Sequence, residues 1–139
     1  MKTLRTLKPV KTTVLVALIA LTVACGYSAK MTPPVAGTVP KIVTFAPPSA
    51  TAGSGAFTLT VNGTNFGSKA VVNFNGAPQT SNTAFVSGSQ VTVAVPASAV
   101  ATPTTITVTV TNPGTTGTGI YGSGGTLPET SSPMSFMVN

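Results

Sequence analysis

The chain has 139 residues, of which 42% are hydrophobic and only 6% are charged. This length favours a single domain. The chain has no histidine, and Glu129 is its only acidic residue. General acid–base catalysis usually requires a histidine or a pair of carboxylates, zinc prefers cysteine and histidine, and calcium prefers several carboxylates. We therefore expect no enzyme activity, no metal site and no cofactor.

The formal net charge of +6 comes mainly from the N-terminus. Beyond residue 24 the chain keeps three lysines and one glutamate, which leaves a net charge of +2. Nucleic-acid binding requires a clustered basic face that offsets the phosphate charge. Three scattered lysines do not form such a face, so we expect no nucleic-acid partner. The basic residues before the first apolar run are Lys2, Arg5, Lys8 and Lys11.

The first apolar run, Val14–Ala24, follows this basic segment and is apolar except for Thr22. It has 11 residues, whereas a membrane-spanning helix needs about 20. A basic start followed by a short apolar run is typical of a secretory signal peptide. The sequence therefore predicts a signal peptide over residues 1–24 and an exported protein.

The end of the run, L-T-V-A-C-G at residues 21–26, resembles the lipobox of bacterial lipoproteins. The resemblance implies cleavage between Ala24 and Cys25, with a diacylglycerol on Cys25, the only cysteine. Thr22 departs from the usual leucine. Gly26 after the cysteine is compatible with the outer membrane or cell surface if the host has two membranes. The alternatives are a plain secretory signal with an incidental cysteine and an uncleaved anchor.

Residues 25–39 carry the predicted lipidated cysteine and then a segment without sustained hydrophobic periodicity that contains Pro33-Pro34. Such composition is typical of an extended, flexible tether. We expect the folded domain to cover residues 40–139.

Alternating apolar and threonine residues dominate this domain, and this period-2 pattern predicts strands with one buried face. Asn75-Gly76 is a strong hairpin signal. Strands are expected around Ile42 and Phe45 and at 56–62, 69–75, 77–80, 83–86, 90–95, 104–111 and 133–138, with Phe85 as the core anchor of its strand. The segments 49–55 and 115–132 are predicted as a flexible turn and a long loop, and 97–103 as a loop with one helical turn. About seven short strands with regular turns predict an all-β, immunoglobulin-like antiparallel β-sandwich.

In order along the chain, these features resemble an IPT/TIG domain, which has an immunoglobulin-like fold. The resemblance covers about 100 residues, from Pro40 to Val138, and its most specific element is Gly63-Thr64-Asn65-Phe66. The other matching elements are Pro40-x-Ile42-x-x-Phe45-x-Pro47, Val72-x-Phe74-x-Gly76, Thr111-Asn112-Pro113-Gly114 and Phe136. The long loop at 115–132 departs from the family pattern. The resemblance implies a scaffold without an active site.

The Gly63–Phe66 motif is interpreted as structural. Gly63 would permit a tight or positive-φ turn, Asn65 would bond neighbouring backbone in that turn, and Phe66 would pack beneath it. Asn62-Gly63-Thr64 also fits the glycosylation pattern N-x-T, although a turn explains the same residues.

Ile120 and Tyr121 are the candidate ligand contacts, because they form an apolar and aromatic pair within the long loop. The alternative is that Tyr121 covers one end of the sandwich. The outward threonine rows of 56–62 and 104–111 form a flat polar face suited to strand pairing or adhesion, or they are plain solvated surfaces. We expect a lipid-anchored structural or protein-interaction module with a protein partner in the envelope or the extracellular space. The alternative is a glycan-binding or adhesive module with a polysaccharide partner.

Overall fold

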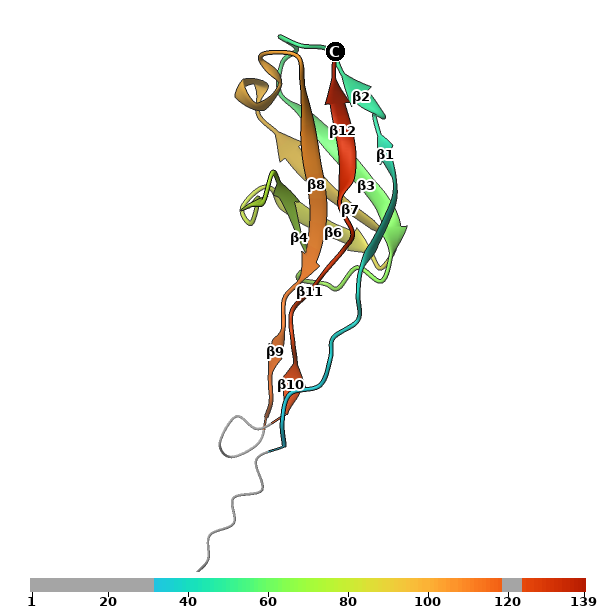
Figure 1. Cartoon of the computed structure of the whole chain (residues 1–139), viewed down its shortest axis with the longest axis vertical. Coiled ribbons are helices and arrows are strands. Elements are labelled where there is room, and N and C mark those ends of the chain that lie inside the picture. The colour runs from blue at the N-terminus through green and yellow to red at the C-terminus, as the bar shows by residue number, and fades with distance from the viewer. Residues whose placement is uncertain (1–31, 119–123) are drawn as a thin grey trace, which may run out of the picture. The chain divides into compact units, whose positions relative to one another are not determined.

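The computed structural model describes residues 32–118 and 124–139 (Figure 1). The predicted signal peptide and its cleavage site at Ala24 and Cys25 lie outside these residues, as do Ile120 and Tyr121. Those predictions therefore stay predictions. Among the residues that the structure describes, no helix is long and apolar enough to cross a membrane.

Two sheets form the two layers of a β-sandwich (Figure 1). The first is antiparallel throughout, with the order β1-β3-β7-β6. Its strands are β1 (Lys41–Ala46), β3 (Phe57–Thr64), β6 (Thr83–Ser87) and β7 (Gln90–Val95). The second has the order β2-β12-β8-β4-β5, with β11 paired to β8. Its strands are β2 (Ser49–Ala50), β4 (Val71–Phe74), β5 (Ala77–Pro78), β8 (Thr104–Asn112), β11 (Glu129–Thr130) and β12 (Met134–Val138).

The predicted all-β sandwich is therefore confirmed, and the one helical turn expected at 97–103 is the 3-10 turn Ala97–Val100. The Asn75-Gly76 hairpin is present as well. Both residues have positive φ, 47° and 82°, which a two-residue turn matched to the twist of its strands requires. Asparagine and glycine adopt this conformation at the lowest cost.

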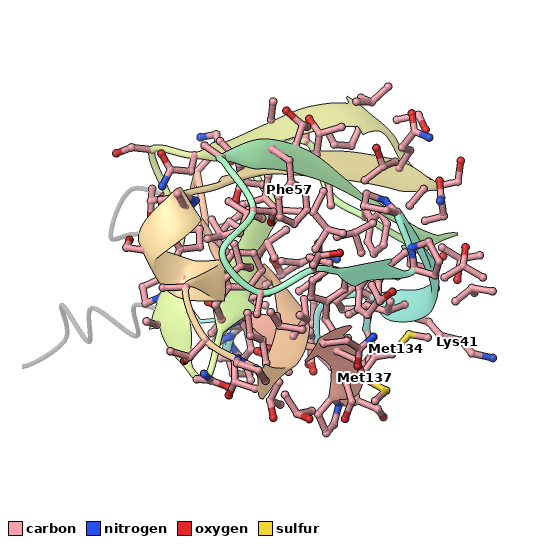
Figure 2. All side chains as sticks on the ribbon, turned by 90° about the horizontal axis from the view of Figure 1, so that it is seen from above. Lys41, Phe57, Met134 and Met137 are labelled. Carbon is pink, nitrogen blue, oxygen red and sulfur yellow. The ribbon has the colours of Figure 1, made fainter. Side chains whose placement is uncertain are left out.

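Apolar side chains from both sheets meet between the layers, as the alternation predicts. Leu59 of β3 lies opposite Val93 of β7, and both are fully buried. Phe45 of the first sheet meets Phe136 of the second in an edge-to-face contact with ring centroids 5.7 Å apart, a favoured aromatic geometry. Seen from above, side chains fill the space between the layers, whereas Met137 lies outside it (Figure 2).

One strand pair differs from the prediction of a wholly antiparallel sandwich. The chain segment 49–55, predicted as a flexible turn, begins with β2, which runs parallel to β12. Backbone bonds hold it there: Asn139 N–H donates to Ala50 O over 2.9 Å, and Ala52 N–H donates to Asn139 O over 2.6 Å. The pairing partner lies at the other end of the sequence, so local composition does not reveal it.

Phe85 is not the buried anchor that the sequence predicts. Its side chain is 41% exposed, and that of the neighbouring Val86 is 53% exposed. Two features explain this. β6 is the last strand of its sheet, and the register between β6 and β7 shifts between Phe85 and Ser87. A ring on an edge strand lacks a neighbouring strand on one side and depends on other parts of the chain for cover. Phe45 of the edge strand β1 has such cover from Phe136, whereas Phe85 stays partly exposed.

The segment 115–132 is not a plain loop in its described part. β9 (Thr115–Thr116) and β10 (Gly125–Thr126) form an antiparallel ribbon, and β11 joins the second sheet. The facing residues Thr115 and Thr126 exchange backbone-to-hydroxyl bonds of 3.2 and 3.1 Å. Glycine and threonine are common in loops, but threonine also favours strands. Here pairing with residues distant in the sequence makes this segment a strand.

The predicted tether is not free of the domain over residues 32–39. Val35 bridges to Thr126 in parallel orientation. Its N–H donates to Gly125 O over 3.0 Å, and its carbonyl accepts from Leu127 N–H over 2.9 Å. The N-terminal segment therefore runs beside β10 as a further extended chain.

The core can be tested at Leu59, which is fully buried in β3. Leu59→Ala removes buried methyl groups and leaves a cavity, so we expect the free energy of unfolding to fall by about 2–5 kcal/mol. Denaturant unfolding followed by circular dichroism measures this change. Leu127→Ala is the matched control, because Leu127 is 49% exposed, and its effect should stay within about 0.5 kcal/mol. Equal effects of the two variants would contradict this core.

Candidate functional site

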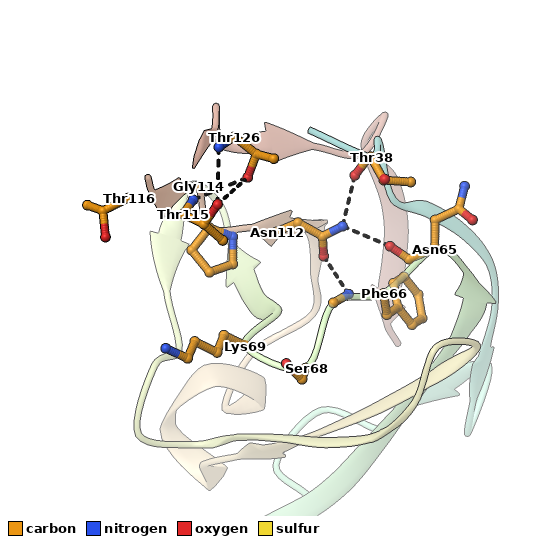
Figure 3. Close-up of a pocket in the computed structure, with 12 residues that line it drawn as sticks. Thr38, Asn65, Phe66, Ser68, Lys69, Asn112, Gly114, Thr115, Thr116 and Thr126 are labelled. Atoms are coloured by element: carbon orange, nitrogen blue, oxygen red, sulfur yellow. Dashed lines mark hydrogen bonds between the residues drawn. The ribbon is translucent and has the colours of Figure 1, made fainter. Parts of the chain in front are cut away.

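A groove of about 640 Å³ lies at the base of the sandwich, which is the end where β8 is followed by β9. We call it the base groove (Figure 3). Its walls come from the N-terminal segment, the loop after β3, the end of β8 and the β9–β10 ribbon. The residues that line it are Thr38, Asn65, Phe66, Gly67, Ser68, Lys69, Asn112, Pro113, Gly114, Thr115, Thr116 and Thr126.

The side chain of Asn112 holds this end of the molecule together (Figure 3). Its Oδ1 accepts from Gly67 N–H over 2.8 Å. Its Nδ2 donates to the carbonyl oxygens of Thr38 and Asn65 over 2.9 and 2.8 Å. Both N–H bonds of the amide are therefore used. Asn112 joins three chain segments and has no donor left for a ligand, so its role in the base groove is structural.

The motif Gly63–Phe66 forms the other half of this junction, although its residues act differently from the prediction. A Cβ on Gly63 would clash with the Lys41 carbonyl and with the Phe66 ring. Gly63 is therefore required for close approach to β1. The positive φ, 62°, belongs to Asn65, whose Nδ2 donates to Val39 O over 3.3 Å and not to backbone in its own turn.

The remaining motif residues connect this turn to the rest of the first sheet. Phe66 is 5% exposed and belongs to the core, and its N–H donates to Gly88 O over 2.9 Å. Thr64 pairs with Lys41 at the end of β3. The motif therefore joins β1, β3 and the β6–β7 turn, and it does this through packing and backbone bonds.

The sequence model of the IPT/TIG domain family matches residues 40–127. The chain belongs to the IPT/TIG family. The match ends before β12, but β12 is an integral strand of this IPT/TIG sandwich, because it pairs with β8 on one side and β2 on the other. Comparisons with curated proteins and with solved structures gave no match.

The base groove of this IPT/TIG domain offers neutral hydrogen-bonding groups and one amine. Lys69 is the only charged residue among those that line it. The hydroxyls of Thr115 and Thr126 lie 3.1 Å apart and bond each other. Within the described ranges, no three histidine, cysteine, aspartate or glutamate side chains lie together.

A second surface of the IPT/TIG domain is the open edge of the first sheet. We call residues 85–87 of β6 the β6 edge. Phe85 and Val86 are exposed there, and β6 pairs with β7 alone. Sequence reasoning missed this surface because alternation predicts which face a residue occupies, and it does not predict whether its strand lies at the edge of a sheet.

The role of Asn112 was also hidden in the sequence, where Asn112-Pro113-Gly114 reads as the end of a strand. Asn112→Ala should lower the free energy of unfolding by about 1–3 kcal/mol, because three hydrogen bonds worth at most about 0.5–1.5 kcal/mol each are lost and the two donated by Nδ2 are exposed. Chemical denaturation measures the difference. Asn82→Ala is the control, since the Asn82 side chain donates a single exposed bond of 3.3 Å. An Asn112→Ala protein as stable as the control would show that the junction is dispensable.

Proposed function

We propose that this protein is a lipid-anchored IPT/TIG module of the bacterial cell envelope that binds a protein partner through the β6 edge and carries out no catalysis. Immunoglobulin-like domains of this family serve as interaction or structural modules, and this chain belongs to the family. The single observation that carries the proposal is the exposure of Phe85 and Val86, 41% and 53%, on a strand with one free side.

An unpaired strand presents a row of backbone N–H and C=O groups to which an extended peptide can add. The start of β6 already bonds to other parts of the chain. The Thr83 hydroxyl accepts from Val72 N–H over 3.2 Å and donates to Gln79 O over 2.8 Å. Residues 85–87 have no such cover among the described bonds. A partner strand would bury Phe85 and Val86 while it satisfies the free backbone groups.

Comparison of the sheet edges singles out β6. Proteins protect edges with lysine, proline, bulges or very short strands. β1 begins with Lys41, is followed by Pro47-Pro48 and carries a bulge between Ile42 and Thr44. β5 ends in Pro78, and both β2 and β5 have two residues. β6 has five residues without charge or proline and relies on its bulge alone, so it is the least protected edge of the sandwich.

The lipid anchor completes the proposal. It is supported by the basic start, the 11-residue apolar run and the cysteine at its end. Each buried lipid CH₂ contributes about 0.8 kcal/mol, and two chains are enough for stable anchoring. The anchor would keep the module at the membrane surface, in the outer membrane or at the cell surface if the host has two membranes.

The partner site is tested with a photoreactive amino acid placed at position 85 of the full chain in the host. We expect a covalent adduct with a protein, because the ring would lie within the interface. Val43 on the opposite edge is 51% exposed and provides the control position, where we expect no adduct. Adding Val86→Lys should remove most of the adduct, because a buried partner strand would meet an unpaired charge. Equal adducts at the two positions, or none at position 85, would contradict the proposal. A polysaccharide partner would give the latter result.

The lipid anchor is tested by growth of the expressing bacterium with labelled palmitate. The full chain should take up label and fractionate with membranes, and Cys25→Ser should abolish both, because the thiol is the attachment site. Ser28→Ala, close to the cysteine, is the control that should change neither. Labelling that survives Cys25→Ser would exclude this anchor.

A further inference from the structure

Three glycines mark the places where three chain segments approach one another below the sandwich. A Cβ on Gly37 would lie 2.5 Å from Leu127 O, and one on Gly114 would lie 2.5 Å from Thr126 O. A Cβ on Gly125 would clash with Thr115 O. The segments are the N-terminal residues 32–37, β9 and β10, which we call the stalk. Close approach of backbones is a specific use of glycine, so the sequence is adapted to this arrangement.

Hydrogen bonds hold the N-terminal segment along its described length. Gly124 N–H donates to Thr32 O over 2.8 Å. Val35 N–H donates to Gly125 O of β10, and Val35 O accepts from Leu127 N–H. Farther along, the carbonyls of Thr38 and Val39 accept from the side chains of Asn112 and Asn65. Pro40 then enters the core, where it is fully buried. The contacts begin at residue 32 and continue into the sandwich.

The stalk needs its third chain. In the β9–β10 ribbon, two residues of one strand pair with two residues of the other. Isolated two-stranded ribbons are marginally stable at best. Pairing of the N-terminal segment with β10 supplies a third strand, and the Asn112 junction joins this strand to the sandwich. In Figure 1 the ribbon continues in line with β8, with the N-terminal segment beside it.

We infer that residues 32–37 are the third strand of a glycine-dependent stalk, so that only seven chain steps separate the paired residues from the lipid on Cys25; this spacing rests on the proposed lipid anchor. A tether from Cys25 to Pro40 would have 15 chain steps and reach about 50 Å, whereas seven steps from Cys25 to Thr32 reach at most about 25 Å. Pairing of residues 32–37 therefore halves the largest distance between the lipid-bearing residue and the first residue that the fold holds.

Hydrogen exchange of the full chain, purified in detergent, tests the stalk without reference to the lipid. We expect the amides of Val35 and Leu127 to be protected in the natural protein. Gly37→Ala should speed their exchange by at least about tenfold, because the new methyl group displaces the Leu127 carbonyl, while the amides of β8 keep their rates. Gly55→Ala is the matched control, since a Cβ at Gly55 meets no atom within 4 Å. Unprotected amides in the natural protein, or unchanged rates in Gly37→Ala, would overturn the stalk.

The spacing is tested with the lipidated chain in phosphatidylethanolamine–phosphatidylglycerol vesicles. A fluorophore on Ser135→Cys, at an exposed position of β12, reports its distance to an acceptor dye in the lipid surface. We expect the mean distance to increase in Val35→Pro, because proline removes the N–H that bonds Gly125 O and releases further chain steps into the tether. An unchanged distance would overturn the spacing. A chain that fails to bind vesicles would overturn the anchor and with it the spacing, while the exchange result decides the stalk by itself.

Discussion

The amide of Asn112 is the interaction on which the base of this molecule depends. It bonds three segments that are far apart in the sequence: the approach to β1 at Thr38, the turn after β3 at Asn65 and Gly67, and the end of β8. The bond to Gly67 N–H is part-buried, and the bonds to the Thr38 and Asn65 carbonyls are exposed. Their contribution comes from joining three segments at one side chain, each bond adding a modest amount of stability. One side chain therefore fixes where the first sheet, the second sheet and the stalk meet.

This junction also explains why the family motif is structural. Gly63 lets β3 and β1 approach closely, Asn65 accepts the left-handed conformation, and Phe66 closes the core. Together they bring the Asn65 carbonyl to Asn112. The motif that best identifies the family therefore builds the scaffold, and the surface that we propose for binding lies elsewhere, at the β6 edge.

The β6 edge and the stalk have different roles in the proposed module. The edge supplies free backbone groups with two exposed apolar side chains, Phe85 and Val86. The stalk leaves seven chain steps between the fold and the proposed lipid on Cys25. A shorter tether raises the effective concentration of a binding surface toward a partner in the same envelope.

The sequence by itself determined the longer strands and most of their buried faces. Alternation at Leu59, Val61, Val91 and Val93 requires one face that is buried away from water, and Asn75-Gly76 specifies its own hairpin, because these signals act between near neighbours. Only the tertiary structure decided that Phe85 is exposed, that Asn112 is a junction, that β2 runs beside β12, and that residues 32–37, β9 and β10 form a stalk. Each of these depends on which distant segment lies alongside. A residue's neighbours in the chain carry its preference for a strand, but they do not carry the identity of its partner strand or the position of that strand in the sheet.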